Sequence, residues 1–169
     1  MVCIALLSCG NSSKPQDNKF TPTPPSKKTI VDVNRYLSEK DKAVIEGYGR
    51  RHKLELAFSE SGFYYHISNQ GNGKQITQSS TAAITGTLGL IDGTPCYTYI
   101  AEAPKIISID KSPEITGLHL ALPMLKEGAN ALFIFPPNLA FGLLGDDDKV
   151  PPRATIVMNI SILKVEEQR

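Results

Sequence analysis

Hydrophobic and polar positions alternate most regularly near the C-terminal end of the chain. Between residues 153 and 165, apolar side chains occupy every second position: Ala154, Ile156, Met158, Ile160 and Ile162. Successive side chains of a strand point to opposite faces, so this pattern predicts a strand with one face in the core. Over 129–135 both alternating sets are largely apolar, which is typical of a central strand covered on both faces.

Other segments complete a mixed architecture. Three leucines at helical spacing predict a short helix near 115–125: Leu118, Leu122 and Leu125. Pro123 would cost about 3 kcal/mol inside a longer helix, so this helix is expected to be short or irregular. Further antiparallel strands are predicted near 63–68, 82–91 and 106–109. The fold class that follows is α+β.

A separate helix is predicted near 33–53. Most of its charged residues fall on other sides than its apolar residues. The apolar side consists of Leu37, Val44, Ile45 and Tyr48. The pattern leaves two interpretations open. The helix either packs on the body of the protein or acts as a spacer, or it provides an association surface.

The N-terminus has a different character. Residues 2–9 form an apolar run that ends in Ser8-Cys9, which is typical of the end of a secretion signal. Leu6-Leu7-Ser8-Cys9 resembles the bacterial lipobox, which implies lipidation of Cys9; the alternatives are an ordinary signal peptide or an unremarkable apolar start. Because a bilayer span takes about 20 apolar residues, attachment would be through the lipid. By analogy, Gly10 and the absence of Asp beside Cys9 favour the outer membrane, with the protein facing the periplasm.

The region after this run is rich in Ser, Pro, Lys and Thr. Such a composition cannot bury a core and favours an extended tether. The expected organisation is a signal-peptide remnant over 1–8, a lipid-anchored flexible tether over 9–30, an N-terminal helix over 31–56 and a globular domain over 57–169.

Composition narrows the possible functions. The 169 residues, 41% of them hydrophobic, suffice for one core. A net charge of +1 provides no long-range field for nucleic acid, and Lys105 is expected to be solvated. The three cysteines and three histidines lack metal-ligand spacing, so no metal, cofactor or disulfide framework is expected. Asp146-Asp147-Asp148 lacks the spaced ligands of a calcium loop and is expected to be a solvated loop.

Motifs in the second half of the chain, taken together, resemble the FKBP family of peptidyl-prolyl isomerases. They are Ile115, Gly117-Leu118, Leu125-Lys126-Glu127-Gly128, Phe135-Pro136-Pro137, Ala140-Phe141-Gly142 and Val150-Pro151-Pro152-x-Ala154-Thr155. The resemblance extends upstream through the hairpin turn Asp92-Gly93 and the strand and turn over 60–73. With the lipobox, residues 46–51 and the segment Glu60-Ser61-Gly62, the chain is most similar to the gliding-motility-associated FKBP-type lipoproteins of Bacteroidetes.

This resemblance implies a twisted antiparallel sheet wrapped on one short helix, and a pocket for X-Pro segments. By aligned position, the family's pocket tryptophan falls at Leu118 and its isoleucine at Ile115. The loop tyrosine falls at Phe141. The remaining pocket candidates are one residue of the same loop, one of the last strand and one near the family's Phe-Asp pair: Val150, Met158 and Tyr97. The family's first tyrosine falls near Gly86, and the chain contains no Trp.

The resemblance also implies a function that requires neither an acid-base residue nor a nucleophile. The expected function is that of a membrane-anchored peptidyl-prolyl cis-trans isomerase that assists folding of exported proteins, among them gliding-motility or secretion components. Its expected partners are X-Pro segments of exported or cell-envelope proteins and the membrane, not nucleic acid. The alternatives are a non-catalytic FKBP-like chaperone or assembly lipoprotein with a degenerate pocket, and a plain structural lipoprotein.

Overall fold

The computed structural model describes residues 27–167. The predicted signal remnant, Cys9 and the tether up to residue 26 lie outside the described residues. The described chain begins with a long helix, α1 (Lys27–His52), which starts earlier than the expected 33. Two short strands follow, β1 (Ala57–Phe58) and β2 (Tyr64–Asn69).

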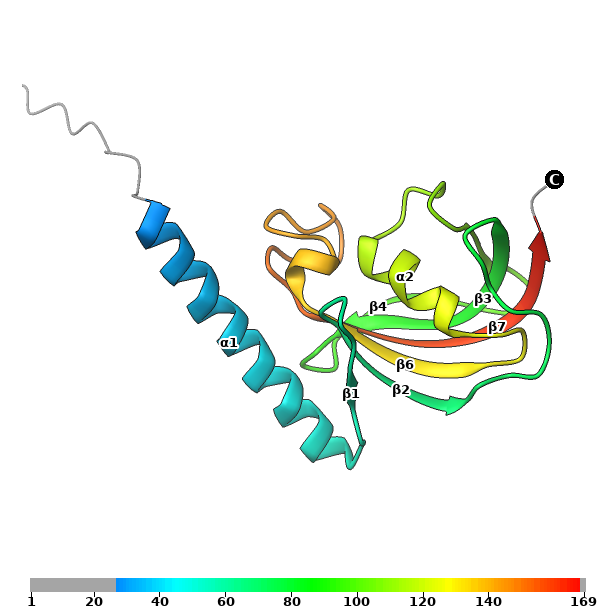
Figure 1. Ribbon diagram of the computed structural model, residues 1–169, viewed down its shortest axis with the longest axis horizontal. Coiled ribbons are helices and arrows are strands. Elements are labelled where there is room, and N and C mark those ends of the chain that lie inside the picture. The colour runs from blue at the N-terminus through cyan, green and yellow to red at the C-terminus, as the bar shows by residue number, and fades with distance from the viewer. Residues whose placement is uncertain (1–26, 168–169) are drawn as a thin grey trace, which may run out of the picture.

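The remaining elements form the body of the molecule (Figure 1). In chain order they are β3 (Ser80–Leu90), β4 (Pro95–Tyr99), β5 (Lys105–Ser108), α2 (Thr116–Ala121), the 3₁₀ turn η1 (Leu122–Met124), β6 (Asn130–Phe135), the 3₁₀ turn η2 (Pro137–Leu139) and β7 (Ile156–Glu167). The strands form one antiparallel sheet in the order β1-β2-β6-β7-β3-β4, and β5 pairs with β3. The predicted α+β class is therefore confirmed.

The central strand is covered on both faces, as its sequence indicates. β6 pairs with β2 on one side and with β7 on the other. Ala131, Phe133 and Phe135 belong to the main core, which the sheet shares with α2, while Leu132 and Ile134 face a second, smaller cluster. The core thus has two layers, one on each side of β6.

The approach of α2 to the sheet depends on a glycine. A Cβ at Gly117 would lie 2.3 Å from the Cδ1 atom of Phe135, so only glycine lets the helix lie this close to β6. Pro123 ends the α-helical geometry, and the chain continues as the 3₁₀ turn η1. The expectation of a short or irregular helix is confirmed.

The second cluster is where α1 meets the body. Ile45 is buried against Tyr64, Ile134 and Val157, so the C-terminal half of α1 packs on the outer face of the sheet. Val44, expected on the same side as Ile45, is instead exposed. The N-terminal half of α1 stands clear of the sheet (Figure 1). Three apolar side chains of this half are exposed: Val31, Val33 and Tyr36.

Two strands were not predicted. β4 forms a hairpin with β3 across the expected Asp92-Gly93 turn, in which Thr94 N–H donates to Asp92 Oδ1 at 2.9 Å. β1 is two residues long, too short for any period to show. No helix among residues 27–167 is long and apolar enough to cross a bilayer.

Candidate functional site

The six pocket candidates, here named the apolar cluster, all belong to the main hydrophobic core or pack against it. Ile115 and Leu118 belong to the start of α2, and Met158 to β7; Val150 ends the loop that precedes β7. These four are buried, whereas Tyr97 and Phe141 are partly buried and pack against the cluster from its edge. Of the six residues, Tyr97 and Phe141 are therefore the more exposed.

Tyr97 connects two segments that are distant in sequence. Its hydroxyl donates a hydrogen bond to Asp146 Oδ2 at 2.5 Å and approaches Asp148 Oδ2 at 3.3 Å. The hydrogen bond to Asp146, with smaller effects of burial and of the nearby carboxylate charges, raises the pKa of the Tyr97 hydroxyl. The Lys149 ammonium lies 4.9 Å from the centroid of the Tyr97 ring, within the range of a cation–π contact. Tyr97 is thus held as a neutral phenol.

Asp146 is the partner that the sequence did not reveal. Its Oδ1 atom accepts hydrogen bonds from the backbone N–H groups of Asp148, Lys149 and Val150, at 3.1, 3.0 and 2.7 Å. The expectation of a solvated acidic loop is wrong for Asp146, although Asp147 and Asp148 are exposed. The available signal was an Asp within a turn-rich loop, because Asp side chains often accept hydrogen bonds from backbone N–H groups shortly after them in sequence.

Gly86 explains one departure from the family pattern. Its φ is +140°, and a Cβ built there would lie 1.8 Å from the carbonyl oxygen of Asn159 on β7. No side chain fits on this backbone, so the family's first tyrosine has no counterpart at this position. The hydroxyl of Tyr97, one strand away on β4, is the phenol that reaches the site.

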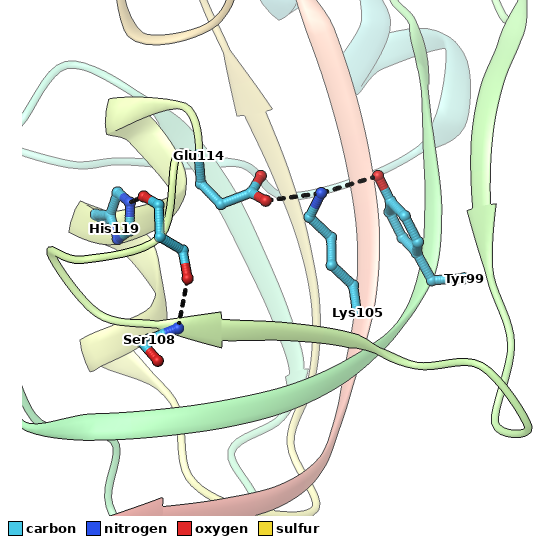
Figure 2. Close-up of polar contacts among 6 residues, drawn as sticks. Tyr99, Lys105, Ser108, Glu114 and His119 are labelled. Atoms are coloured by element: carbon cyan, nitrogen blue, oxygen red, sulfur yellow. Dashed lines mark hydrogen bonds and ion pairs between the residues drawn. The ribbon is translucent and has the colours of Figure 1, made fainter. Parts of the chain in front are cut away.

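A second polar group lies beside the start of α2, as Figure 2 shows. The Lys105 ammonium bridges Glu114 Oε1 at 2.8 Å and the Tyr99 hydroxyl at 3.4 Å. Burial would lower the pKa of Lys105, but the hydrogen bond and charge of Glu114 outweigh it and raise the pKa. The expectation that Lys105 is solvated is wrong, because its side chain is largely covered. Glu114 directly precedes Ile115, so this ion pair fixes one edge of the apolar cluster.

His119 secures the loop that leads into α2. Its Nδ1 accepts from the backbone N–H of Asp110 at 3.1 Å, and its Nε2 lies 3.0 Å from the carbonyl oxygen of Ser112. These two contacts define a neutral ring with the proton on Nε2. The Ser112 hydroxyl accepts from the Ser108 N–H at 2.8 Å (Figure 2). His119 therefore has a structural role, consistent with its lack of ligand-like spacing.

Two cavities lie along α1 rather than at the candidate pocket. The first, of about 550 Å³, is bounded by Leu37, Phe58, Tyr64, Pro137 and Leu143, among others. The second, of about 610 Å³, lies at the C-terminal end of α1. Within residues 27–167, no group of three or more His, Cys, Asp or Glu side chains is placed to hold a metal ion.

Among the described residues at the cluster, no thiol is poised for covalent chemistry. Cys96 is a buried free thiol whose pKa is raised by burial and then by the charge of Asp146. Thiols in apolar surroundings are inert, since the thiolate is the reactive form. The available chemistry is therefore desolvation by apolar walls, with the oxygen of Tyr97 as a polar edge.

Comparisons with known proteins bear on the family rather than on individual site residues. The family described as FKBP-type peptidyl-prolyl cis-trans isomerase matches residues 69–163, which include β3 to β6, α2 and most of β7. A probable FKBP-type isomerase, FkpA, from Neisseria meningitidis is 35% identical over 105 residues, which are 62% of this chain and 38% of that protein. A human protein described as an inactive peptidyl-prolyl cis-trans isomerase, FKBP6, is 24% identical over 106 residues, or 62% of this chain and 32% of that protein. The chain thus spans less than half the length of these two relatives.

The fold is also found in a solved structure of an FkpA protein. The crystal structure of FkpA from Escherichia coli superposes with a TM-score of 0.66 at 23% sequence identity, covering 87% of this chain and 76% of that one. At this identity the superposition establishes the fold, and the sequence match over more than half of the chain establishes the family. The chain belongs to the FKBP-type peptidyl-prolyl cis-trans isomerase family.

Proposed function

We propose that this protein catalyses cis-trans isomerisation of X-Pro bonds in exported proteins. The family match over residues 69–163 carries the proposal, and the apolar character of the candidate cluster supports it. Leu118, Val150 and Met158 are buried in the main core, and Phe141 is partly buried against it. These side chains keep the hydrophobic character of the family pocket while differing in shape.

Such a pocket supplies what the reaction needs. Rotation about an X-Pro imide has a barrier of about 18–20 kcal/mol because partial double-bond character is lost in the twisted state. In water, hydrogen bonds to the planar imide add to its stability, and an apolar surface removes them. Contacts that fit the twisted form better than the planar forms lower the barrier without any nucleophile or metal.

The direct test is NMR exchange spectroscopy of a short Ala-Ala-Pro-Phe peptide with the purified chain. The wild-type protein is expected to accelerate cis-trans exchange. Phe141→Ala should reduce kcat/KM by about tenfold, because the variant loses most of the ring surface that contacts proline, worth about 1–3 kcal/mol. Exchange with wild-type protein that matches the buffer rate, even at high protein concentration, would refute the catalytic function.

Leu144→Ala provides the matched control. Leu144 belongs to the same loop as Phe141 and is 81% exposed, so its truncation removes a comparable apolar group outside the cluster. Its kcat/KM should stay within about twofold of wild type. Equal losses in the two variants would mean that the cluster is not the pocket.

A non-catalytic chaperone is the second candidate, and a specific observation favours it. Gly86 leaves no room for a side chain, and Leu118 stands where the family has its tryptophan. The human relative described as inactive belongs to the same family. Under this alternative the chain suppresses aggregation of a denatured client protein, measured by light scattering, while leaving the exchange rate of the peptide unchanged.

We propose in addition that the protein is anchored to the membrane through Cys9, facing the periplasm from the outer membrane. The lipobox-like sequence Leu6-Leu7-Ser8-Cys9 supports this proposal. Mass spectrometry of the N-terminal peptide from the membrane fraction should find acyl chains on Cys9. Cys9→Ser should release the protein into the soluble fraction, and an unmodified Cys9 in the mature protein would contradict the anchor.

The proposed clients are X-Pro segments of cell-envelope proteins, including components of gliding motility or secretion. Similarity of the N-terminal motifs to gliding-motility-associated lipoproteins supports this choice. Deletion of the gene should then lower the abundance of such components in the envelope, measured by quantitative proteomics. Unchanged abundance together with normal gliding would contradict this assignment.

A further inference from the structure

The loop between Gly142 and Val150 is folded around a single carboxylate. Three of its residues adopt positive φ values: Gly142 at 65°, Gly145 at 81° and Asp147 at 61°. Asp146 Oδ1 accepts hydrogen bonds from the backbone N–H groups of Asp148, Lys149 and Val150 at 2.7–3.1 Å, and the Asp146 N–H donates to the carbonyl oxygen of Val150 at 3.1 Å. The path of this loop therefore depends on the side chain of Asp146.

The other oxygen of the same carboxylate points out of the loop. Asp146 Oδ2 accepts the 2.5 Å hydrogen bond from the Tyr97 hydroxyl on β4, across 49 residues of sequence. Two further contacts join the same loop to β4. The Lys149 ammonium lies over the Tyr97 ring, and the Cys96 thiol donates to the carbonyl oxygen of Lys149 at 3.6 Å. The tip of this loop is therefore held against β4 by contacts from both segments.

These contacts act on the candidate pocket from both sides. Phe141 directly precedes the loop and Val150 ends it, so the loop conformation sets how these two residues lie relative to each other. Tyr97 supplies the polar edge on the opposite strand. A Cβ at Gly145 would lie 2.2 Å from the carbonyl oxygen of Val150, so the turn is tight and has little freedom to adjust.

We propose that Asp146 is a positioning residue that keeps the proline pocket formed before substrate arrives. The Tyr97 hydroxyl anchors its carboxylate to β4. The inference rests on the proposed function. A loop already in its bound conformation loses little conformational entropy when a peptide binds, whereas a loosened loop must be ordered by the peptide at the expense of affinity.

This role predicts a particular kinetic signature. Ordering the loop costs the same in the ground-state complex and in the transition state, so losing Asp146 should raise KM and leave kcat nearly unchanged. A residue that only stabilised the whole fold would reduce the fraction of active protein, which lowers apparent kcat at constant KM. The two roles are therefore separable in one experiment.

The experiment compares Asp146→Ala and Tyr97→Phe with the control Asp147→Asn in the full chain. Asp147→Asn also removes a negative charge from the loop, and asparagine tolerates the positive φ of this position. Amide hydrogen exchange by NMR reports the Val150 N–H directly. Titration with the Ala-Ala-Pro-Phe peptide gives Kd, and exchange spectroscopy gives KM and kcat.

Asp146→Ala should speed exchange of the Val150 amide and raise both Kd and KM by about tenfold, with kcat within about twofold of wild type. Tyr97→Phe should shift Kd and KM in the same direction, and Asp147→Asn should match wild type. If the wild-type protein binds the peptide without catalysis, the proposed function fails while the Kd values still test Asp146. Unchanged Kd and KM in Asp146→Ala would overturn the inference, as would a wild-type protein that neither binds nor isomerises the peptide.

Discussion

Two carboxylates hold the edges of the candidate site by different means. Asp146 uses backbone N–H groups and a phenol, and its environment is polar and partly open. Glu114 pairs with Lys105 where both side chains are largely covered, so removing either partner would leave a poorly solvated charge. Neither pairing has a local sequence signature, since the Tyr97–Asp146 contact joins residues 49 positions apart. The apolar candidates could be placed by family resemblance, whereas these polar partners could not.

The ionisation of Asp146 makes the loop sensitive to acid. Partial burial would raise its pKa, but the hydrogen bonds from Tyr97 and from the loop backbone outweigh burial and hold the pKa below its ordinary value of 3.8. A lowered folded-state pKa means that this stabilisation is present above about pH 4 and is lost as pH falls through the folded pKa. The gap in free energy of unfolding between wild type and Asp146→Asn should therefore narrow below about pH 4.

Denaturant unfolding of both proteins from neutral pH to about pH 3 measures this gap. Asp92, whose pKa is also lowered, first by the hydrogen bond from the Thr94 backbone, is present in both proteins, so its contribution cancels. A gap that stays constant over the whole range would show that Asp146 does not gain from its ionised form.

At the scale of elements, the accuracy of prediction depended on how regular the local pattern of hydrophobic positions is. β7 alternates clearly and β6 is a nearly continuous apolar run, and both were predicted within three residues of their observed bounds. Pro123 correctly indicated a short, irregular helix, since α2 is followed directly by the 3₁₀ turn η1. β4 was missed because its stability comes from pairing with β3 rather than from a repeating pattern. The burial of Ile45 and exposure of Val44, adjacent on the same predicted face, likewise depend on how α1 crosses the sheet.

The packing of α2 yields a prediction about two helical glycines. Gly117→Ala would place a methyl group 2.3 Å from Phe135 Cδ1 and 2.9 Å from the carbonyl oxygen of Leu139. The variant should lose about 1–3 kcal/mol of stability despite the better helix propensity of alanine. Gly47→Ala in α1 is the control, because its Cβ would meet no atom closer than 3.4 Å, and it should gain about 0.5–1 kcal/mol. Chemical denaturation measures the free energy of unfolding of both variants. An unchanged value for Gly117→Ala would contradict the close packing of α2 on β6.

On the scale of the whole molecule, α1 divides into a docked half and a projecting half. The docked half is attached by Ile45 and by the ion pair between Asp41 and Arg153 at 3.3 Å. Arg153 follows the loop around Asp146, and its backbone N–H donates to Gly142 at 3.0 Å. The helix outside the family match is thus in contact with the base of the pocket loop. If α1 provides an association surface, as its sequence pattern allows, that surface lies on the projecting half, residues 27–40.

This division predicts unequal effects of truncating apolar side chains along one helix. Ile45→Ala should cost about 2–4 kcal/mol, because Ile45 is 1% exposed and the cavity left behind would be enclosed by the sheet. Val33→Ala, at an exposed position on the projecting half, should change stability by no more than about 0.5 kcal/mol. Thermal unfolding at low protein concentration measures both. A large loss in Val33→Ala would indicate that the projecting half is covered in solution.

Gly86 finally bears on how this site can be altered. The carbonyl group of Asn159 on β7 occupies the space where a Cβ of residue 86 would lie. The paired strands β3 and β7 therefore leave no room for a tyrosine there. Reintroducing that tyrosine by a single substitution would force the two most extensively paired strands apart before any hydroxyl reached the pocket. Protein engineers who wish to strengthen proline binding should leave this strand pair intact and vary Leu118 or Met158, because position 86 has no room for an aromatic side chain.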